Sequence, residues 1–423
     1  MPAVSVRDIE IKDDTTCWCS DLVAGTHGRG FWILDDVTPL RQSAEAKEAT
    51  QAYLFKPEPA VRVRWATNEP TPWPPELPAG ENPPPGAIID YYLASDVSTP
   101  VTLDVLTAAG KVIRSYTSDV PVLNPDPATD PVAYNKICEA TPNAQDCSLP
   151  LYWPAPQLRL LTTAGAHRFW WDMRYEPLGG GGGGRGGGGG ANGAVPHRTY
   201  SGGGGPWAAP GTYTVRLTVA GHSYTQPLTL HYDPRLKNAA ALAQLTGLTT
   251  EMYFGAMNAR DAGVRARGLL TELDSMKGEG IDAYKAKVVA LLNGAAAAAP
   301  EAAGAGAAGA GGAAAAGAGA RGGGRGGRGG GGGGGGGGRG GRGGGGGPIA
   351  PTFDGVSAAM YAAASGMQSA DRAPTSTQVE ACDKARAASR PVMSNWNTLI
   401  TTDLSALNVK RKAAGLPVVT VPK

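Results

Sequence analysis

Several features that would identify a function are missing from this sequence. It has no apolar run of about 18 residues, so it predicts no transmembrane helix. Lys and Arg number 38 against 36 Asp and Glu, and a net charge of +2 gives no argument for a nucleic-acid or membrane partner. Gly-x-Ser-x-Gly, His-Glu-x-x-His and the P-loop lysine are absent. The sequence therefore predicts no catalytic residue, no metal site and no cofactor.

Cysteine is also scarce, with five in the chain. Cys138 and Cys147 lie in a loop rich in Pro, Asn and Asp, where a disulfide would cross-link an otherwise loose segment. Cys382 falls on a predicted helix face and is interpreted as a small core residue. The residues after Met1, Pro-Ala-Val-Ser-Val-Arg, have no apolar core of a signal peptide.

Cys17 and Cys19 flank Trp18 and would point to the same side of a strand. The favoured interpretation is a turn insertion with incidental thiols. A close thiol pair is the first alternative. The second is half of a metal site, for which only His27 lies nearby, so that a zinc ion would have two or three ligands at most.

The segment Asp21–Arg41, DLVAGTHGRGFWILDDVTPLR, is the most informative part of the chain. It reads as a strand, a tight glycine turn, a second strand with Phe31 and Ile33, and an exit. Before it, Val4 and Val6, and then Ile9 and Ile11, alternate in the manner of a strand. A two-stranded ribbon is marginal in water and cannot bury its own apolar face. We interpret the segment as the edge of the last blade of a β-propeller whose other blades are not in the chain.

This segment resembles the closing blade of large secreted bacterial propeller proteins with BNR (Asp-box) repeats, related to sortilin-type propellers, which carry DLVVGTHGRGFWVLDD-x-x-PLR here. The resemblance extends to the Ig-like domain and helical tail that follow in that family, through 101–114, 165–175, 210–219 and the region after Asp233-Pro-Arg235. Several members are labelled glycosyl hydrolases, a label that belongs to the propeller. The chain departs from the family in its missing blades, its two glycine tracts, the insertion at Cys17–Cys19 and the absence of any Asp-box (Ser-x-Asp-x-Gly-x-Thr-Trp).

The predicted fold is mainly β with an α-helical tail. It comprises a propeller-edge hairpin, an Ig-like β-sandwich and an antiparallel helical hairpin interrupted by Gly/Ala-rich low complexity. The predicted boundaries are 1–45 for the last-blade remnant, 46–235 for the sandwich with a Gly-rich insertion at 179–205, 236–293 for a helical segment, 294–350 for an Ala/Gly/Arg insertion, 351–410 for a second helical segment and 411–423 for a tail.

Short alternating runs bounded by Gly or Pro give the strand candidates. They are 62–65, 87–93, 102–106, 112–117, 167–173, 211–219 and 222–230. Apolar residues at three- and four-residue steps predict helices over 238–276 and 281–292. A further helix follows Thr375, which would cap it, and Pro391 should bend it.

Arginines punctuate the second glycine tract, at 321–347, in the manner of an RGG box that binds RNA. The tract has no aromatic residue to stack on bases and its arginines are sparse, so a solvated linker is favoured. Weak contact with a polyanion or a cell-surface glycan is an alternative. We expect no nucleic-acid partner.

Asp35 and Asp36 look like paired carboxylates, but adjacent strand residues point to opposite faces, which favours a structural turn over a glycosidase pair. In the turn Thr26-His27-Gly28-Arg29, the His27 and Arg29 side chains could be functional or could tie the turn to carbonyls of a neighbouring blade.

Aromatic residues supply the candidates for carbohydrate contact. Trp170 and Trp171 are adjacent, so alternation places one inward as core and one outward as a sugar platform. Trp207 is a similar candidate.

These observations favour a non-catalytic C-terminal accessory region of a secreted BNR-repeat propeller protein. Its expected partners are the upstream blades of the same protein and an extracellular glycan or protein, and its expected location is secreted, periplasmic or at the cell surface. The alternative is part of a BNR-type glycoside hydrolase whose active site lies on the missing blades. A weaker alternative is RGG-type nucleic-acid binding.

Overall fold

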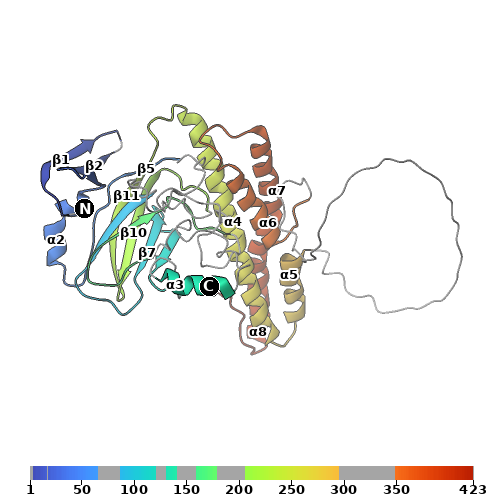
Figure 1. Ribbon diagram of the computed structural model, residues 1–423. Coiled ribbons are helices and arrows are strands. Elements are labelled where there is room, and N and C mark those ends of the chain that lie inside the picture. The colour runs from blue at the N-terminus through green and yellow to red at the C-terminus, as the bar shows by residue number, and fades with distance from the viewer. Residues whose placement is uncertain are drawn as a thin grey trace. The chain divides into compact units, whose positions relative to one another are not determined.

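A computed structural model describes residues 3–16, 18–64, 86–120, 130–140, 159–178, 205–294 and 348–422. These residues form strands arranged in sheets and a C-terminal helical region (Figure 1). The chain divides into two compact units. One comprises Met1–Asp261 and Val356–Arg390, and the other comprises Ala262–Gly355 and Pro391–Lys423. The glycine tracts and the Pro-rich stretch at 69–85 lie outside the described residues, apart from a few at their ends.

The N-terminal sheet has three antiparallel strands in the order β1 (Val6–Asp14), β2 (Cys19–Thr26) and β3 (Phe31–Leu34). It includes the hairpin predicted from the sequence, with β1 paired along β2 from Asp14↔Cys19 to Val6↔Thr26. A register shift between Val6 and Asp8 marks a bulge in β1. The hairpin therefore does have one partner strand nearby, although β3 gains none on its other side among the described residues.

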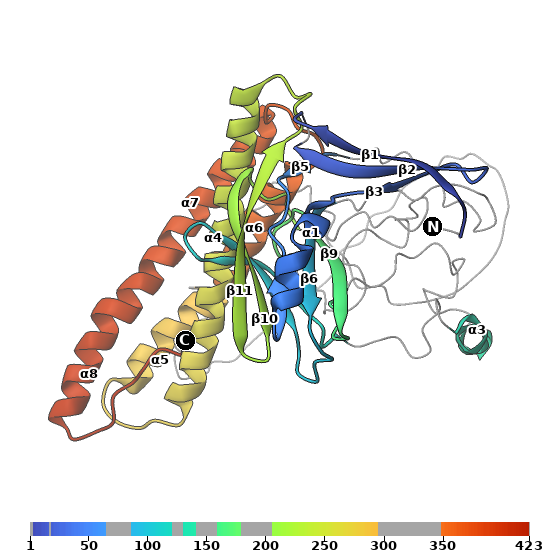
Figure 2. The same ribbon diagram turned by 90° about the vertical axis from the view of Figure 1, so that its left-hand side faces the viewer.

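Two further sheets form the main core of the first unit (Figure 2). The larger has five strands in the order β5 (Ala60–Arg62), β11 (His222–Tyr232), β10 (Gly211–Val219), β7 (Thr102–Thr107) and β8 (Val112–Thr117). The smaller has the order β4 (Ala52–Leu54), β6 (Ala87–Leu93) and β9 (Gly165–Trp171). Neighbouring strands are antiparallel except for the parallel pair β11 and β5.

Aromatic contacts join the inner faces of these two sheets. The Trp171 ring of β9 meets Tyr213 of β10 with 5.2 Å between centroids, and Phe169 meets Tyr116 of β8 at 4.8 Å. Ile89, also on the inner face, is fully buried. The alternation seen in the sequence thus places one side of each strand in a shared apolar core.

Most predicted strands agree with the observed ones to within a few residues, but the region around them holds more structure than expected. The short helix α1 (Thr38–Arg41) lies in the predicted last-blade remnant, and α2 (Ser43–Glu48) crosses its predicted end at residue 45. The strand β4 lies near the start of the predicted sandwich, where no strand was predicted. Helix α3 (Pro131–Ala140) was predicted as part of a loop. Its start is explained by Asp130, whose Oδ1 accepts the Ala133 amide at 3.0 Å, and by Pro131 at the first helical position.

The C-terminal helices are α4 (Ala239–Asp274), α5 (Ile281–Asn293), α6 (Phe353–Gly366), α7 (Ser376–Thr398) and α8 (Leu404–Ala413), with the π-helical turn η4 (Leu399–Asp403) before α8. Thr375 caps α7 as predicted: its Oγ1 accepts the Gln378 amide at 3.3 Å, and Gln378 Oε1 accepts the Thr375 amide at 2.8 Å. Pro391 lies inside α7, which continues to Thr398.

Each unit has its own helix contacts. In the first, Tyr253 of α4 stacks on Tyr175 with 4.4 Å between ring centroids and donates its hydroxyl to the Glu176 carbonyl at 3.0 Å. In the second, the rings of Phe353 and Trp396 lie edge to face with 5.6 Å between their centroids, and the Tyr284 hydroxyl donates to the Leu399 carbonyl at 3.1 Å.

Candidate functional site

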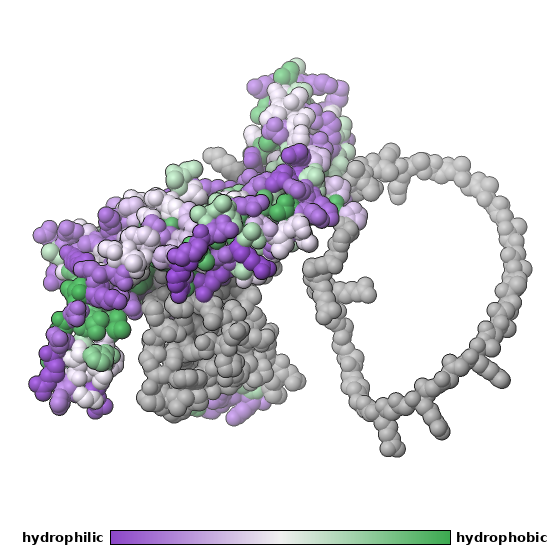
Figure 3. Space-filling model, turned by 90° about the horizontal axis from the view of Figure 1, so that it is seen from above, coloured by the Kyte–Doolittle hydropathy of each residue, from purple (hydrophilic) through white to green (hydrophobic). Residues whose placement is uncertain are grey.

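The N-terminal sheet exposes an apolar face. In its register Ile9 lies opposite Ala24 and Ile11 opposite Leu22, and cross-strand partners share a face. On β3, Trp32 lies opposite Ala24 and Leu34 lies opposite Leu22, so both continue the same face. The relative exposures are 59% for Ile9, 49% for Ile11, 39% for Trp32 and 41% for Leu34. Figure 3 shows hydrophobic residues gathered where this sheet projects, at the lower left. We call Ile9, Ile11, Leu22, Trp32 and Leu34 the apolar face.

The opposite side of the sheet is mixed. Asp8, Glu10 and Lys12 of β1 are exposed there, as a solvated surface would have them. On β3, however, the same side carries Phe31 at 81% exposure and Ile33 at 63%. The strand β3 is therefore apolar and exposed on both of its sides.

The glycine turn between β2 and β3 is closed by its own residues. Thr26 donates its amide (3.2 Å) and its hydroxyl (2.7 Å) to the Gly30 carbonyl, and the Trp32 indole donates to the Arg29 carbonyl at 3.1 Å. Gly28 and Gly30 have φ of 73° and 72°, which glycine adopts without strain. The side chains of His27 and Arg29 are exposed and make no hydrogen bond within the described part of the chain.

Asp35 and Asp36 do not form a carboxylate pair around a cleft. The Asp36 side chain is 5% exposed, and its Oδ1 accepts the Thr38 amide at 2.8 Å. Its own amide donates to Asp21 Oδ1 at 3.0 Å. Asp36 thus fixes the exit of β3, as the structural interpretation of this motif predicted, and its φ of 55° belongs to that tight turn. Burial, followed by the charge of Asp21, raises the pKa of Asp35.

Arg168 of β9 ties this exit to the smaller sheet of the core. Its guanidinium donates to the carbonyls of Asp35 (2.5 Å) and Asp36 (3.0 Å). It also forms a bidentate pair with the carboxylate of Asp90, with both bonds at 3.0 Å. Sequence reasoning missed Arg168 and Asp90. One signal in the sequence could have indicated them: Asp90 and Arg168 are opposite charges on two predicted strands that are otherwise rich in apolar residues.

Glu58 makes a second connection at the same place. Its two carboxylate oxygens accept the Ser20 amide at 3.3 Å and the Thr38 hydroxyl at 3.0 Å. Burial raises the pKa of Glu58 to about 7, and the negative charge of Asp36 adds to this. We call Asp36, Glu58, Asp90 and Arg168 the joint, because they connect the N-terminal sheet to the core sheets.

The three tryptophan candidates have different environments. Trp171 is fully buried, so it is the inward, core member of the Trp170–Trp171 pair and offers no ring face to a sugar. Trp207 is 8% exposed and offers none either, so the carbohydrate contact predicted for it is wrong. Trp207 is packed beside the guanidinium groups of Arg174, 4.1 Å from the ring centroid, and Arg64, at 5.6 Å. Trp170 lies on the other face of β9 and is half-buried. A carbohydrate contact at Trp170 stays a prediction.

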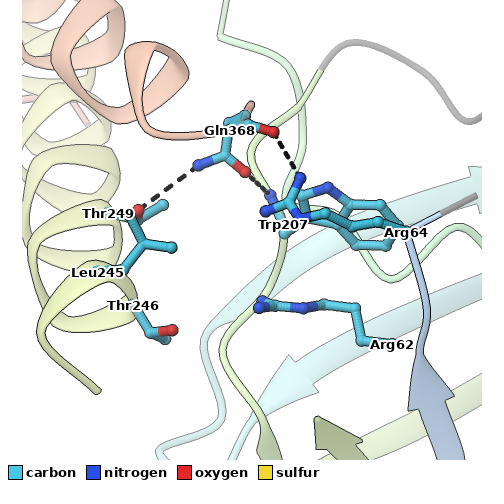
Figure 4. Close-up of a pocket in the computed structure, with 7 residues that line it drawn as sticks. All are labelled: Arg62, Arg64, Trp207, Leu245, Thr246, Thr249 and Gln368. Carbon is cyan, nitrogen blue, oxygen red and sulfur yellow. Dashed lines mark hydrogen bonds between the residues drawn. The ribbon is translucent and has the colours of Figure 1, made fainter. Parts of the chain in front are cut away.

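A small cavity lies beside Trp207 (Figure 4). Two of its lining side chains form salt bridges with the Asp371 carboxylate. The distances are 3.0 Å from Arg62 Nη2 and 2.6 Å from Arg64 Nε. Gln368 accepts the Trp207 amide at 2.8 Å. The cavity has room for about one water molecule, which is too little for a substrate. We assign this cluster to the attachment of the helices to the sheets.

The cysteines favour a structural role. Cys19 and Cys138 are each disulfide-bonded, so the interpretation of Cys19 as an incidental thiol is wrong. Cys382 is free and buried, as its helix position predicted. Cys17 and Cys147 lie outside the described residues, so the predicted pairing of Cys138 with Cys147 stays a prediction. Among the residues that the structure describes, no group of three or more His, Cys, Asp or Glu is placed to hold a metal ion.

No protein-family model, curated protein or solved structure matches this chain. None of the helices in the described ranges is both long enough and apolar enough to cross a bilayer. The geometry of the apolar face and the joint therefore carries the functional argument.

Proposed function

We propose that this chain is a non-catalytic accessory region of a secreted BNR-repeat propeller protein, and that its N-terminal sheet docks against propeller blades. The observation that carries the proposal is the apolar face. A three-stranded sheet that exposes Ile9, Ile11, Trp32 and Leu34 together has a surface that water solvates poorly, and such patches mark interaction sites.

The joint supports the same function. Arg168 holds the exit of β3 through two carbonyls and Glu58 holds the start of β2, so the sheet is fixed at one end. Among the residues that the structure describes, no element covers its apolar face. This combination of a firm anchor and an exposed apolar face fits a domain that docks against a propeller blade. The buried, hydrogen-bonded carboxylate of Asp36 argues against a role for this motif in glycoside cleavage.

The proposal also specifies the finer fold and the location. The two facing sheets would be the Ig-like sandwich of that family, and the C-terminal helices its antiparallel helical hairpin. Disulfide bonds at Cys19 and Cys138 favour an oxidising compartment, that is, a secreted, periplasmic or cell-surface location. An exposed partner such as a glycan would have Trp170 as its aromatic contact.

The test begins with the reading frame upstream of the Met1 codon. We expect in-frame blades with Ser-x-Asp-x-Gly-x-Thr-Trp repeats, and we expect those blades, expressed separately, to bind this chain. Ile9→Lys together with Leu34→Lys should abolish that binding, while Lys12→Ala on the opposite side of the sheet should leave it intact. Blades that bind both variants equally well, or a frame that encodes no blades, would overturn the proposal. Glycosidase assays on the blade-bearing chain test the hydrolase alternative.

A further inference from the structure

The free edge of β3 carries an inference that goes beyond docking of blades. Among the described residues, β3 pairs only with β2. Edge strands are commonly protected by charged residues or proline, and the outer strand β1 has such charges in Asp8, Glu10 and Lys12. The residues of β3 are Phe-Trp-Ile-Leu, with neither charge nor proline. This edge is open to strand addition.

The ladder with β2 determines which backbone groups of β3 remain available. The Thr26 amide donates to the Gly30 carbonyl, and residues two apart repeat the same pattern in an antiparallel pair. Trp32, opposite Ala24, and Leu34, opposite Leu22, therefore direct their backbone groups to β2. The amides and carbonyls of Phe31 and Ile33 point outward to the free edge.

The sequence around β3 is complementary to itself in antiparallel orientation. A basic residue, Arg29, precedes the four apolar residues, and an acidic residue, Asp35, follows them. If Phe31 pairs with Ile33 of a second copy, the turn that carries Arg29 comes to the end of that copy's β3, where Asp35 follows, and the two-fold axis repeats the contact. Arg29 is exposed without a hydrogen-bond partner in the described part of the chain, and Asp35 is half-buried, so each would gain a partner.

We propose that β3 pairs with β3 of a second copy of this chain, forming a continuous six-stranded sheet across a two-fold axis. In this register Phe31 meets Ile33 of the other copy, Trp32 meets Trp32, and Arg29 meets Asp35. The contact is made at the edge and uses Trp32 alone of the apolar face, so Ile9, Ile11, Leu22 and Leu34 stay available to blades. Its failure would therefore not remove the proposed function, which is tested separately by blade binding.

Cross-linking tests the register directly. Trp32 would lie at the two-fold axis in a non-hydrogen-bonded pair, whose Cα atoms are about 4.5 Å apart, within the range for a disulfide. We expect Trp32→Cys to form an oxidised dimer, and Leu34→Cys, on the same face but away from the axis, to form none. The unsubstituted chain under the same oxidant is the control for the native cysteines.

Sedimentation equilibrium of the full chain provides a second readout. Dimers should form as concentration rises, Ile33→Lys should abolish them, and Arg29→Asp should weaken them by roughly tenfold, consistent with the loss of a charge-assisted pair. Combining Arg29→Asp with Asp35→Arg should restore much of the affinity. A monomer at every concentration overturns the proposal, and so does equal cross-linking of Trp32→Cys and Leu34→Cys.

Discussion

The N-terminal sheet and the two core sheets use the same alternation of residues but bury it differently. Trp171 and Ile89 of the core sheets are completely buried, whereas Trp32 and Ile9 of the N-terminal sheet are 39% and 59% exposed. The difference lies in what covers each sheet. The core sheets cover one another, but no described element covers the apolar face. The pattern in the sequence thus predicts a strand and a covered side, and it does not say which segment or molecule provides the cover.

The largest expected difference between the two regions is in stability. Trp171→Ala removes a fully buried side chain that packs on Tyr213, and it should lower the free energy of unfolding by about 3–5 kcal/mol. Phe31→Ala, at 81% exposure, should change it by less than about 0.5 kcal/mol. Urea denaturation of both variants checks this. Similar losses for the two would contradict the comparison.

The joint should contribute an intermediate effect. Arg168→Ala removes hydrogen bonds to Asp90 and to two carbonyls, and leaves the Asp90 carboxylate buried without its cation. We expect a loss of about 2–3 kcal/mol. Hydrogen exchange should show the loss concentrated in β2 and β3. The matched control is Lys12→Ala, which removes an exposed ion pair with Asp14. It should lower the free energy of unfolding by less than about 1 kcal/mol.

The change in folding stability with pH that Glu58 causes should be smaller than the loss from Arg168→Ala, and its sign follows from the pKa shift. The pKa of Glu58 is raised to about 7 from 4.5, so the folded state binds a proton more tightly than the unfolded state. That contribution to stability is fully present below pH 4.5 and is lost as pH rises through about 7. Other charged groups lie around Glu58 and the joint. The acidic ones are Asp13, Asp21 and Asp36, and the basic ones are Arg41 and Arg168.

Glu58→Gln provides the measurement for that effect. The variant cannot titrate, so its thermal unfolding midpoint should vary less between pH 5 and pH 8 than that of the unsubstituted chain. Because Glu58 is only partly buried, solvent screening should keep the difference small. An identical pH profile for the two proteins would show that Glu58 does not titrate in this range.

Sequence reasoning located the elements whose signal is local. The Gly turn with Thr26, the strand alternation of β6 to β11 and the Thr375 cap each depend on neighbours in the chain, and each was found. The joint could not be found in this way, because Arg168 lies 132 residues from Asp36 and only the fold brings them together. The sequence did not show which of Trp170 and Trp171 is the inward one, or that Trp207 is buried, because an aromatic side chain gives no sign of which face of its strand is covered.

The most direct test of the central claim is hydrogen exchange of the N-terminal sheet, with and without blades encoded upstream of the Met1 codon. In the chain alone, amides of β3 should exchange much faster than those of β6 and β9, under conditions where the chain is monomeric. With blades bound, β1 to β3 should become protected while β6 and β9 stay unchanged. An N-terminal sheet that is as protected as the core when alone, or that gains no protection from blades, would contradict the account.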